Sequence, residues 1–328
     1  MRNHFITVVL MVGAALTGCA HKGPITPTTT PALDAQRAAL ESFDSDRVTA
    51  FDGETGEALV WSEIVERAAA ADVVMIGEMH GHPEGLATAA ALFSDVIALE
   101  AHAAALSMEF FERDEQAAID DYLAGITDEE QFRKATGRTD GNYPPGHREM
   151  VETARSAGAP VYGANAPRRY VRLARTDGYE TLAGLTFEQR RLFAIPSSLP
   201  DGPYKDRFFE VMGGMRGHSD EDAEMTDEER AAKEAEQREM ILTFFRSQSV
   251  WDATMAETIA WGLDDGRRPI VHVVGQFHSD FEGGTVERLR VLAPDAQILI
   301  VSMVDTDAPT MRDEDEGRAD ILIHVGDD

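Results

Sequence analysis

Two segments of the sequence share one pattern, an apolar run that ends in Gly-x-x-His. They are residues 73–80 and 271–278. Each run is typical of a buried strand, and ligands of open α/β sheets gather beyond the carboxyl ends of the strands. The glycine lets the chain turn and lets a ligand approach the backbone. One such histidine is more often a hydrogen-bonded structural residue, but the pair predicts that His80 and His278 converge on one ligand.

Two carboxylates and one amide are further candidates, because polar groups are costly to bury in apolar surroundings. Glu109 stands in the apolar run 106–111, and Glu78 lies inside the first Gly-x-x-His pattern. A carboxylate in such a strand must be paired, ligating or protonated. Gln248 interrupts an apolar helical stripe, so it either closes a hydrogen bond in the core or points into a site.

These residue types permit two kinds of chemistry. Imidazole and carboxylate together suit zinc, manganese or cobalt, so His80, Glu109 and His278 are candidate ligands of a divalent metal with an open position for water. Without a metal, His80 could act as a general base. The sequence has no His-Glu-x-x-His, Gly-x-Ser-x-Gly or phosphate-loop motif, and no Cys-x-x-Cys-His for covalent haem. Other histidines in or beside expected loops and helix ends are His82, His102, His147 and His218.

The elements that would position these residues alternate between strands and helices. Short apolar runs bounded by turn residues predict strands, and amphipathic patterns between them predict helices. Such an alternation implies a mostly parallel central sheet covered by helices on both faces, so we expect a doubly wound α/β fold. The predicted strands are 73–79, 106–111, 160–164, 269–277, 297–304 and 321–325, and the predicted helices include 84–101, 114–124, 147–157, 167–175 and 285–292.

The stretch from about residue 185 to residue 262 has no comparable apolar strand and carries a long helical pattern. We expect it to form a smaller helical subdomain, inserted beside the sheet. Residues that recur at steps of three and four should share one buried helix face. They are Phe244, Gln248, Trp251, Met255 and Ile259.

The first residues are typical of export. Residues 1–18 combine Arg2 with an apolar run that is too short to span a bilayer, as in a signal peptide. The run ends beside Cys19, the only cysteine, in a sequence that resembles the cleavage box of bacterial lipoproteins. An ordinary signal peptide with an incidental cysteine is the alternative. We expect an exported protein that is lipid-anchored through Cys19 to a bacterial membrane. The expected membrane is the outer membrane, with the protein on the side that faces the periplasm.

Composition bounds the rest of the chain. Residues 19–34 are rich in Thr and Pro and predict an extended tether, which leaves 35–328 for one α/β domain with its helical insertion. The formal net charge is -29, so nucleic acid and anionic lipid are not expected partners. The acidic stretch 220–239 is interpreted as a solvated helix face.

At these residues the sequence resembles the ChaN-like haem-binding lipoproteins of the Tiki superfamily, which also includes metalloproteases and erythromycin esterases. The superfamily pattern of two Gly-x-x-His motifs and a glutamate is matched by residues 77–80, Glu109 and residues 275–278. Features closer to the ChaN-like proteins are the Glu-aromatic-aromatic-x-Arg-Asp-x-Gln run at 109–116, Ala-Asn-Ala-Pro-Arg at 164–168, and the run from Gln248 to Ala256.

The resemblance implies haem bound at a homodimer interface, with tyrosine as the ligand of ferric iron. Tyr143 is the first candidate, because the loop 141–147 can present it outward. The loop after His80 departs from the family pattern, so either His82 replaces a lost histidine or the ligand set differs. Tyrosines in the central half of the chain are Tyr143, Tyr162, Tyr170 and Tyr204.

Three functional hypotheses follow. The first is a surface-tethered haem-binding lipoprotein in haem or iron uptake. The alternative is a hydrolase of the protease or esterase type that uses His80, Glu109 and His278, with or without a divalent metal. The third is a scaffold protein whose histidines remain from a lost site. The candidate cofactor-binding residues are Glu78, His80, Glu109, Tyr143, Gln248 and His278.

Overall fold

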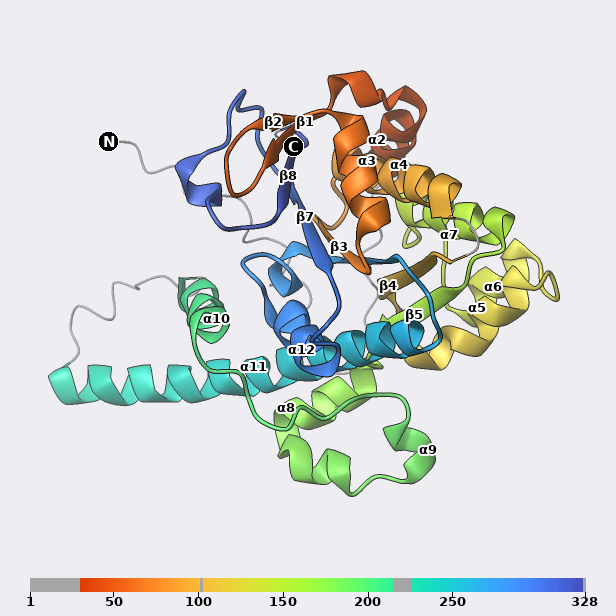
Figure 1. Cartoon of the computed structure of the whole chain (residues 1–328). Helices are drawn as coiled ribbons and strands as arrows, with labels where there is room; N and C mark the ends of the chain where they lie inside the picture. Colours follow the sequence, from red (N-terminus) through yellow and green to blue (C-terminus); the bar gives the residue numbers. More distant parts are fainter. Residues whose placement is uncertain (1–29, 101–102, 215–225, 327–328) are drawn as a thin grey trace.

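An eight-stranded sheet runs through the centre of the computed structural model, which describes residues 30–100, 103–214 and 226–326 (Figure 1). The strand order is β2-β1-β8-β7-β3-β6-β4-β5. Neighbours from β8 to β5 run parallel, whereas β1 is antiparallel to β2 and β8. The predicted α/β class with a mostly parallel sheet is therefore confirmed. The strands are β1 (Thr49–Asp52), β2 (Ala58–Leu59), β3 (Val73–Glu78), β4 (Ala105–Glu112), β5 (Val161–Asn165), β6 (Ile270–Gly275), β7 (Ile298–Val304) and β8 (Ile321–His324).

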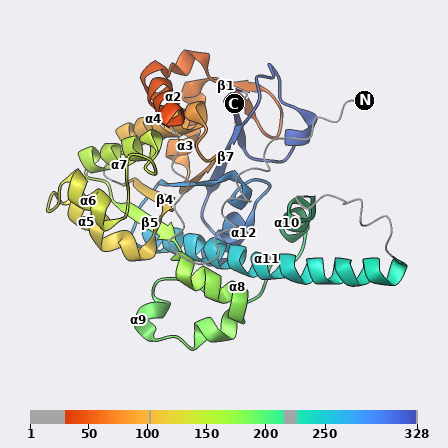
Figure 2. The same ribbon diagram turned by 180° about the vertical axis from the view of Figure 1, so that it is seen from behind.

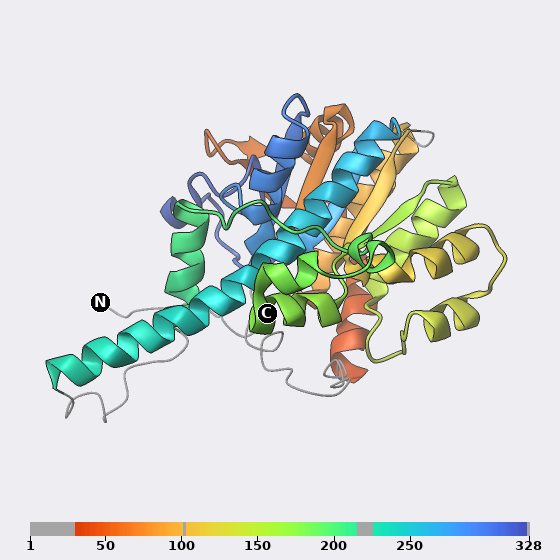
Figure 3. The same ribbon diagram turned by 90° about the horizontal axis from the view of Figure 1, so that it is seen from below.

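Helices cover both faces of this sheet, as Figures 2 and 3 show from two further directions. Every residue of β3 and of β6 is buried, which explains their continuous apolar sequences. The helices are α2 (Thr30–Ser42), α3 (Trp61–Ala70), α4 (Pro83–Glu100), α5 (Gln116–Leu123), α6 (Glu129–Ala135), α7 (Pro145–Ala157), α8 (Arg168–Ala183), α9 (Phe187–Arg190), α10 (Pro203–Gly214), α11 (Asp227–Asp264) and α12 (Gly284–Leu292), with the short 3-10 turns η2 (Ser45–Arg47), η3 (Arg113–Glu115), η5 (Gln276–His278) and η6 (Asp313–Asp315).

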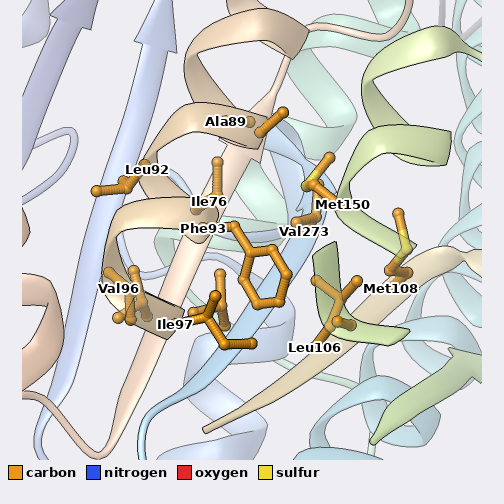
Figure 4. Close-up of a cluster of buried hydrophobic side chains, with 14 of the residues drawn as sticks. Ile76, Ala89, Leu92, Phe93, Val96, Ile97, Leu106, Met108, Met150 and Val273 are labelled. Carbon is orange, nitrogen blue, oxygen red and sulfur yellow. The ribbon is translucent and has the colours of Figure 1, made fainter. Parts of the chain in front are cut away.

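Successive strand residues point to opposite faces and enter different cores. Val74 and Ile76 of β3 pack with α3, α4 and α7, whereas Val73 and Met75 pack with α11 and α12. Figure 4 shows the first core, where Phe93 of α4 lies among side chains of three strands and α7. These two cores fix the strands whose ends carry the predicted site.

Helix α11 corrects the predicted subdomain. The described part of the stretch from 185 to 262 holds no strand, as expected, but this stretch is not simply inserted beside the sheet. The second half of α11 lies on the sheet, where Met255 and Ile259 belong to one of its two cores. The first half packs against α10 through Phe245 and Phe208. Periodicity identified a buried helix face but could not identify what covers it.

The start of the domain lies earlier than the tether prediction allows. Helix α2 begins at Thr30, with Pro31 in its first turn, where proline is tolerated because that turn has no intrahelical donor to lose. Leu33 is buried, and Gln36 Nε2 donates to Gly81 O at 2.8 Å. Residues 30–34 therefore belong to the domain.

Several sequence predictions fall outside the described residues. These are the signal peptide at 1–18, the lipidation site Cys19, and the histidines at 102 and 218. Within the described ranges, no helix combines the length and the apolar character that a membrane crossing requires.

Candidate functional site

Three adjacent strand ends bring the predicted residues together. Because β3 and β4 both pair with β6, His80 after β3, Glu109 in β4 and His278 in η5 meet at the carboxyl edge of the sheet. His278 Nε2 lies 3.8 Å from Glu109 Oε1. The His80 ring lies against Gly275, where a Cβ would stand 2.9 Å from His80 Nε2. The glycine of the second motif therefore makes room for the histidine of the first.

Glu78, the last residue of β3, is the buried centre of one half of the site. Its side chain is 3% exposed, so the carboxylate needs partners within the protein. Oε1 accepts a hydrogen bond from His80 Nδ1 at 2.8 Å, and Oε2 accepts one from His147 Nε2 at 2.7 Å. His147 lies in the first turn of α7, and its approach to the site could not be judged from spacing. Strand β3 and helix α7 therefore fix this carboxylate jointly.

The Glu78–His80 pair shifts both pKa values. Burial opposes ionisation of Glu78, but the charges and hydrogen bonds of His147 and His80 hold its pKa well below the usual range. Desolvation of the covered part of its ring opposes protonation of His80, but its hydrogen bond to Glu78 and the charges of Glu109 and Glu78 raise its pKa to about 9. His80 is therefore protonated at neutral pH. Its side chain is 47% exposed, whereas the other five histidines of the described ranges are buried.

Asp252 of α11 is the buried centre of the other half. Its Oδ1 accepts hydrogen bonds from His278 Nδ1 at 2.6 Å and from Thr285 Oγ1 at 2.9 Å. Its Oδ2 accepts one from the Tyr204 hydroxyl at 2.8 Å. Gln248, one turn earlier in α11, donates from Nε2 to that hydroxyl at 3.1 Å and lies 3.2 Å from both ring nitrogens of His278. The sequence allowed two positions for the Gln248 amide, in the core or at a site, and the structure places it at the site.

Glu109 lies beside two imidazoles, each of which is paired with a buried carboxylate. Burial opposes protonation of His278, but the charges of Asp252 and Glu109 raise its pKa above the ordinary value. Burial opposes ionisation of Glu109, but the charges of His278 and His80 lower its pKa. The Gly275 amide also donates to Glu109 Oε2 at 2.7 Å. The site thus places ionised Glu78 and Glu109 beside two imidazoles whose pKa values are raised.

The expectation that its loop presents Tyr143 outward is wrong. The Tyr143 side chain is buried, and its ring stacks on Phe110 with centroids 5.7 Å apart and meets Phe111 and Phe132 edge-on. Its hydroxyl has no hydrogen-bond partner within the described structure, and burial raises its pKa well above the ordinary value. Contact with three aromatic rings outweighs the exposure that a loop position would allow. In this conformation the phenol cannot reach a ligand outside the core.

The other candidate tyrosines are also withdrawn from solvent. Tyr204 and Tyr170 are buried, and only Tyr204 lies at the site, where it donates to Asp252. Tyr162 is partly buried and lies near the opposite edge of the sheet. Its ring approaches Gly262, next to Ile270 at the start of β6.

His82 caps a helix instead of joining the cluster. Its Nδ1 accepts a hydrogen bond from Gly85 N at 3.1 Å at the start of α4, and its side chain is 3% exposed. This satisfies one of the free amides of the helix end. The structure therefore gives no support to His82 as a replacement ligand.

The described side chains do not form a metal-binding group. Among them, no set of three or more His, Cys, Asp or Glu residues is arranged to hold a metal ion. His80, Glu109 and His278 are close to one another, and the His80 ring lies over Gly275, but the three do not form such a set. The predicted metal site is absent from this arrangement.

Sequence reasoning missed Asp252 and Thr285 as site residues. For Asp252 a signal existed, since it stands four residues after Gln248 on the same helix face. A carboxylate there is as costly to bury as Glu109 in its strand, and the same argument identifies both. Thr285 gives no such signal, because a threonine near a helix start is common as a local hydrogen-bonding residue.

Two Gly-x-x-His strand ends and a strand glutamate lie at one sheet edge of this α/β protein, in the pattern that resembles the Tiki superfamily. A sequence model of the family described as "Haem-binding uptake, Tiki superfamily, ChaN" matches residues 64–289. The match covers more than half of the chain, so the chain belongs to this family. The resemblance seen in the sequence is confirmed.

One solved structure supports the fold. The structure described as "Cofacial heme binding to ChaN of Campylobacter jejuni" matches with a TM-score of 0.63 at 12% identity, over 84% of this chain and 96% of the other. Two weaker matches have lower TM-scores. The type III effector HopBA1 matches with a TM-score of 0.41 at 14% identity, over 87% of this chain and 98% of the other. An erythromycin esterase mutant matches with a TM-score of 0.42 at 12% identity, over 78% of this chain and 76% of the other. No curated protein matches the chain.

Proposed function

We propose that this chain is a haem-binding protein of haem or iron uptake, held at a membrane surface by a lipid on Cys19. The observation that carries the proposal is the family match over residues 64–289, and the solved ChaN of similar fold is described by its cofacial haem binding. The anchor rests on the sequence around Cys19, which is typical of lipoproteins. Haem is the cargo in this proposal, and the protein supplies its binding and orientation.

His80 is the residue best placed to meet a haem. Its side chain is 47% exposed, whereas the phenols of Tyr143, Tyr170 and Tyr204 are buried. Glu78 occupies its Nδ1, so Nε2 is the nitrogen that would meet the haem, and a contact with the iron would require release of the Nε2 proton. The donor set at this sheet edge therefore fits haem through an imidazole and does not fit it through the buried phenols of Tyr143, Tyr170 and Tyr204 in this conformation.

The proposal is tested by titrating hemin into the mature chain with Cys19→Ala, made without residues 1–18. We expect a Soret band that grows with hemin and saturates in the micromolar range. A featureless, non-saturating absorbance would reject haem binding. We also propose a homodimer, which sedimentation with and without hemin would detect as a doubled mass.

Hydrolysis is the second candidate, and one observation favours it. Two imidazoles, each oriented by a buried carboxylate, flank Glu109, an arrangement that serves acid–base chemistry. Protonated His80 could donate a proton to a leaving group while ionised Glu109 accepts one from the attacking water. Esters and peptides would be the substrates.

A library of esters and peptides, assayed with the wild type, His80→Ala and Glu109→Gln, tests this candidate. We expect activity on at least one substrate and its loss, by about 100-fold or more, in both variants. Circular dichroism would check that both variants fold. No turnover by the wild type, or equal turnover by the variants, would refute the hydrolase.

A further inference from the structure

Asp252 is a fully buried carboxylate in the middle of a 38-residue helix. Ionised carboxylates in such places are expensive unless hydrogen bonds satisfy their oxygens. Three donors do so here, and they come from three different parts of the fold. Thr285 belongs to α12, Tyr204 to α10, and His278 to the 3-10 turn after β6.

The carboxylate is held so closely that it cannot turn. A Cβ at Gly284 would stand 2.3 Å from Asp252 Oδ2 and 2.4 Å from Tyr204, so only glycine lets α12 begin at this distance. Tyr204 and Thr285 bind different oxygens of the carboxylate and fix its plane. The third donor, His278 Nδ1, therefore meets an acceptor whose direction is set before any ligand arrives.

This geometry determines which nitrogen of His278 carries the proton. An ionised carboxylate only accepts hydrogen bonds, so the ring nitrogen 2.6 Å from Asp252 must be Nδ1–H. In the neutral ring, Nε2 is then the free acceptor. Nε2 lies 3.8 Å from Glu109 Oε1, beyond hydrogen-bond distance, and 3.2 Å from Gln248 Nε2, so its lone pair can accept from the Gln248 amide or meet a ligand or a bridging water.

We propose that Asp252 is a positioning residue that holds His278 as the Nδ1–H tautomer and directs Nε2 toward Glu109 and the ligand. The inference rests on the proposed function only in taking this sheet edge as the binding site. Asp252 does not touch the ligand and acts through His278. The long helix α11 thereby sets the orientation of a site residue that belongs to a different part of the sequence.

Long-range ¹⁵N NMR of the histidine rings tests the proposal, with the His278 signals assigned by their loss in His278→Gln. Spectra are recorded at alkaline pH, where the ring is neutral. We expect the Nδ1–H pattern in the wild type and its loss in Asp252→Asn. Tyr204→Phe and Thr285→Val are matched controls, because each removes one donor to the same carboxylate and leaves its contact with His278. Both should retain the Nδ1–H pattern.

An Nε2–H pattern in the wild type, or an unchanged Nδ1–H pattern in Asp252→Asn, overturns the proposal. If Asp252→Asn does not fold by circular dichroism, the wild-type spectrum alone decides. Hemin titration of the same wild-type sample separates this inference from the proposed function. Absence of a Soret band together with an Nδ1–H ring rejects haem binding and leaves the role of Asp252 standing.

Discussion

In the Glu78–His80 pair, the charge of each side chain stabilises the ionised form of the other. The folded-state pKa of His80 is about 9, above its ordinary value of 6.5. Its contribution to stability is therefore fully present below pH 6.5 and is lost as the pH rises through about 9. Glu78 acts in the other direction: its pKa is lowered, so its contribution is present above its ordinary 4.5 and falls away in acid.

Replacing Glu78 tests this coupling. In Glu78→Gln we expect the pKa of His80 to fall from about 9 toward 6.5, because the hydrogen-bonded carboxylate is gone and only the charge of Glu109 remains. NMR titration of the His80 ring protons measures the shift. An unchanged midpoint would show that Glu78 does not set the charge of His80.

Tyr143 provides a test of the corrected prediction. Its buried hydroxyl has no partner in the described structure, so Tyr143→Phe removes an unsatisfied polar group and keeps the ring stacking on Phe110. We expect the free energy of unfolding to stay equal or to rise by about 1 kcal/mol, and hemin binding to be unchanged. Denaturant unfolding and hemin titration measure the two effects. Loss of the Soret band would return Tyr143 to the ligand set.

The site residues differ in how far the sequence could identify them. His80 and His278 were predictable because each ends an apolar run in the same motif, and Glu109 because a strand carboxylate demands a partner. His147 could not be placed, because the packing of α7 on α4, α2 and β4 brings it to Glu78. The burial of Tyr143 depends on aromatic neighbours at positions 110, 111 and 132, which no local pattern joins.

At the scale of elements, Arg113 ties the start of η3 to α11. Its guanidinium donates to Thr258 Oγ1 at 2.9 Å, to Glu257 Oε2 at 2.8 Å and to Thr254 O at 2.6 Å, and it lies 4.1 Å from the centre of the Trp261 ring. The arginine of the family-like run at 109–116 thus anchors the helix that carries Asp252.

We expect Arg113→Ala to lower the free energy of unfolding by about 3 kcal/mol, because it leaves Glu257 and a buried carbonyl unpaired. Arg113→Lys should not restore it, since an ammonium lacks the planar fork of donors. Arg169→Ala is the control: its ion pair with Asp114 is solvent-exposed and should contribute less than about 1 kcal/mol. Equal losses in Arg113→Ala and the control would contradict this role.

The strongest elements of the fold were predictable, and the weakest were not. The six parallel strands could be predicted because most of their residues are apolar and buried. Strand β2 has two residues and β1 has four, which is too short for periodicity to register. At the edge strand β5, the side chain of Gln116 forms hydrogen bonds with the backbone: it donates to Val161 O and accepts from Gly163 N. No sequence pattern predicts such a contact.

For the whole molecule, the acidic charge bears on how it reaches a membrane. A net charge of -29 gives no attraction to anionic lipid surfaces, so the membrane attachment that we propose rests on the lipid at Cys19 alone. We expect the wild type to incorporate labelled palmitate and to sediment with membranes, and Cys19→Ser to lose the label and stay in the supernatant. Retention of Cys19→Ser on membranes would refute the anchor.

The central claim is that haem binds at the sheet edge where His80 lies. Hemin titrations of the wild type, His80→Ala and His324→Gln, followed at the Soret band, test it most directly. His324 is a buried histidine of β8 bonded to Ala308 O, two strands from β3, and serves as the matched control. We predict a saturable band for the wild type and for His324→Gln, and affinity weakened about 10-fold or more, or about 1.4 kcal/mol, for His80→Ala. Equal affinity in all three proteins would contradict this site, and no saturable band in the wild type would contradict the function.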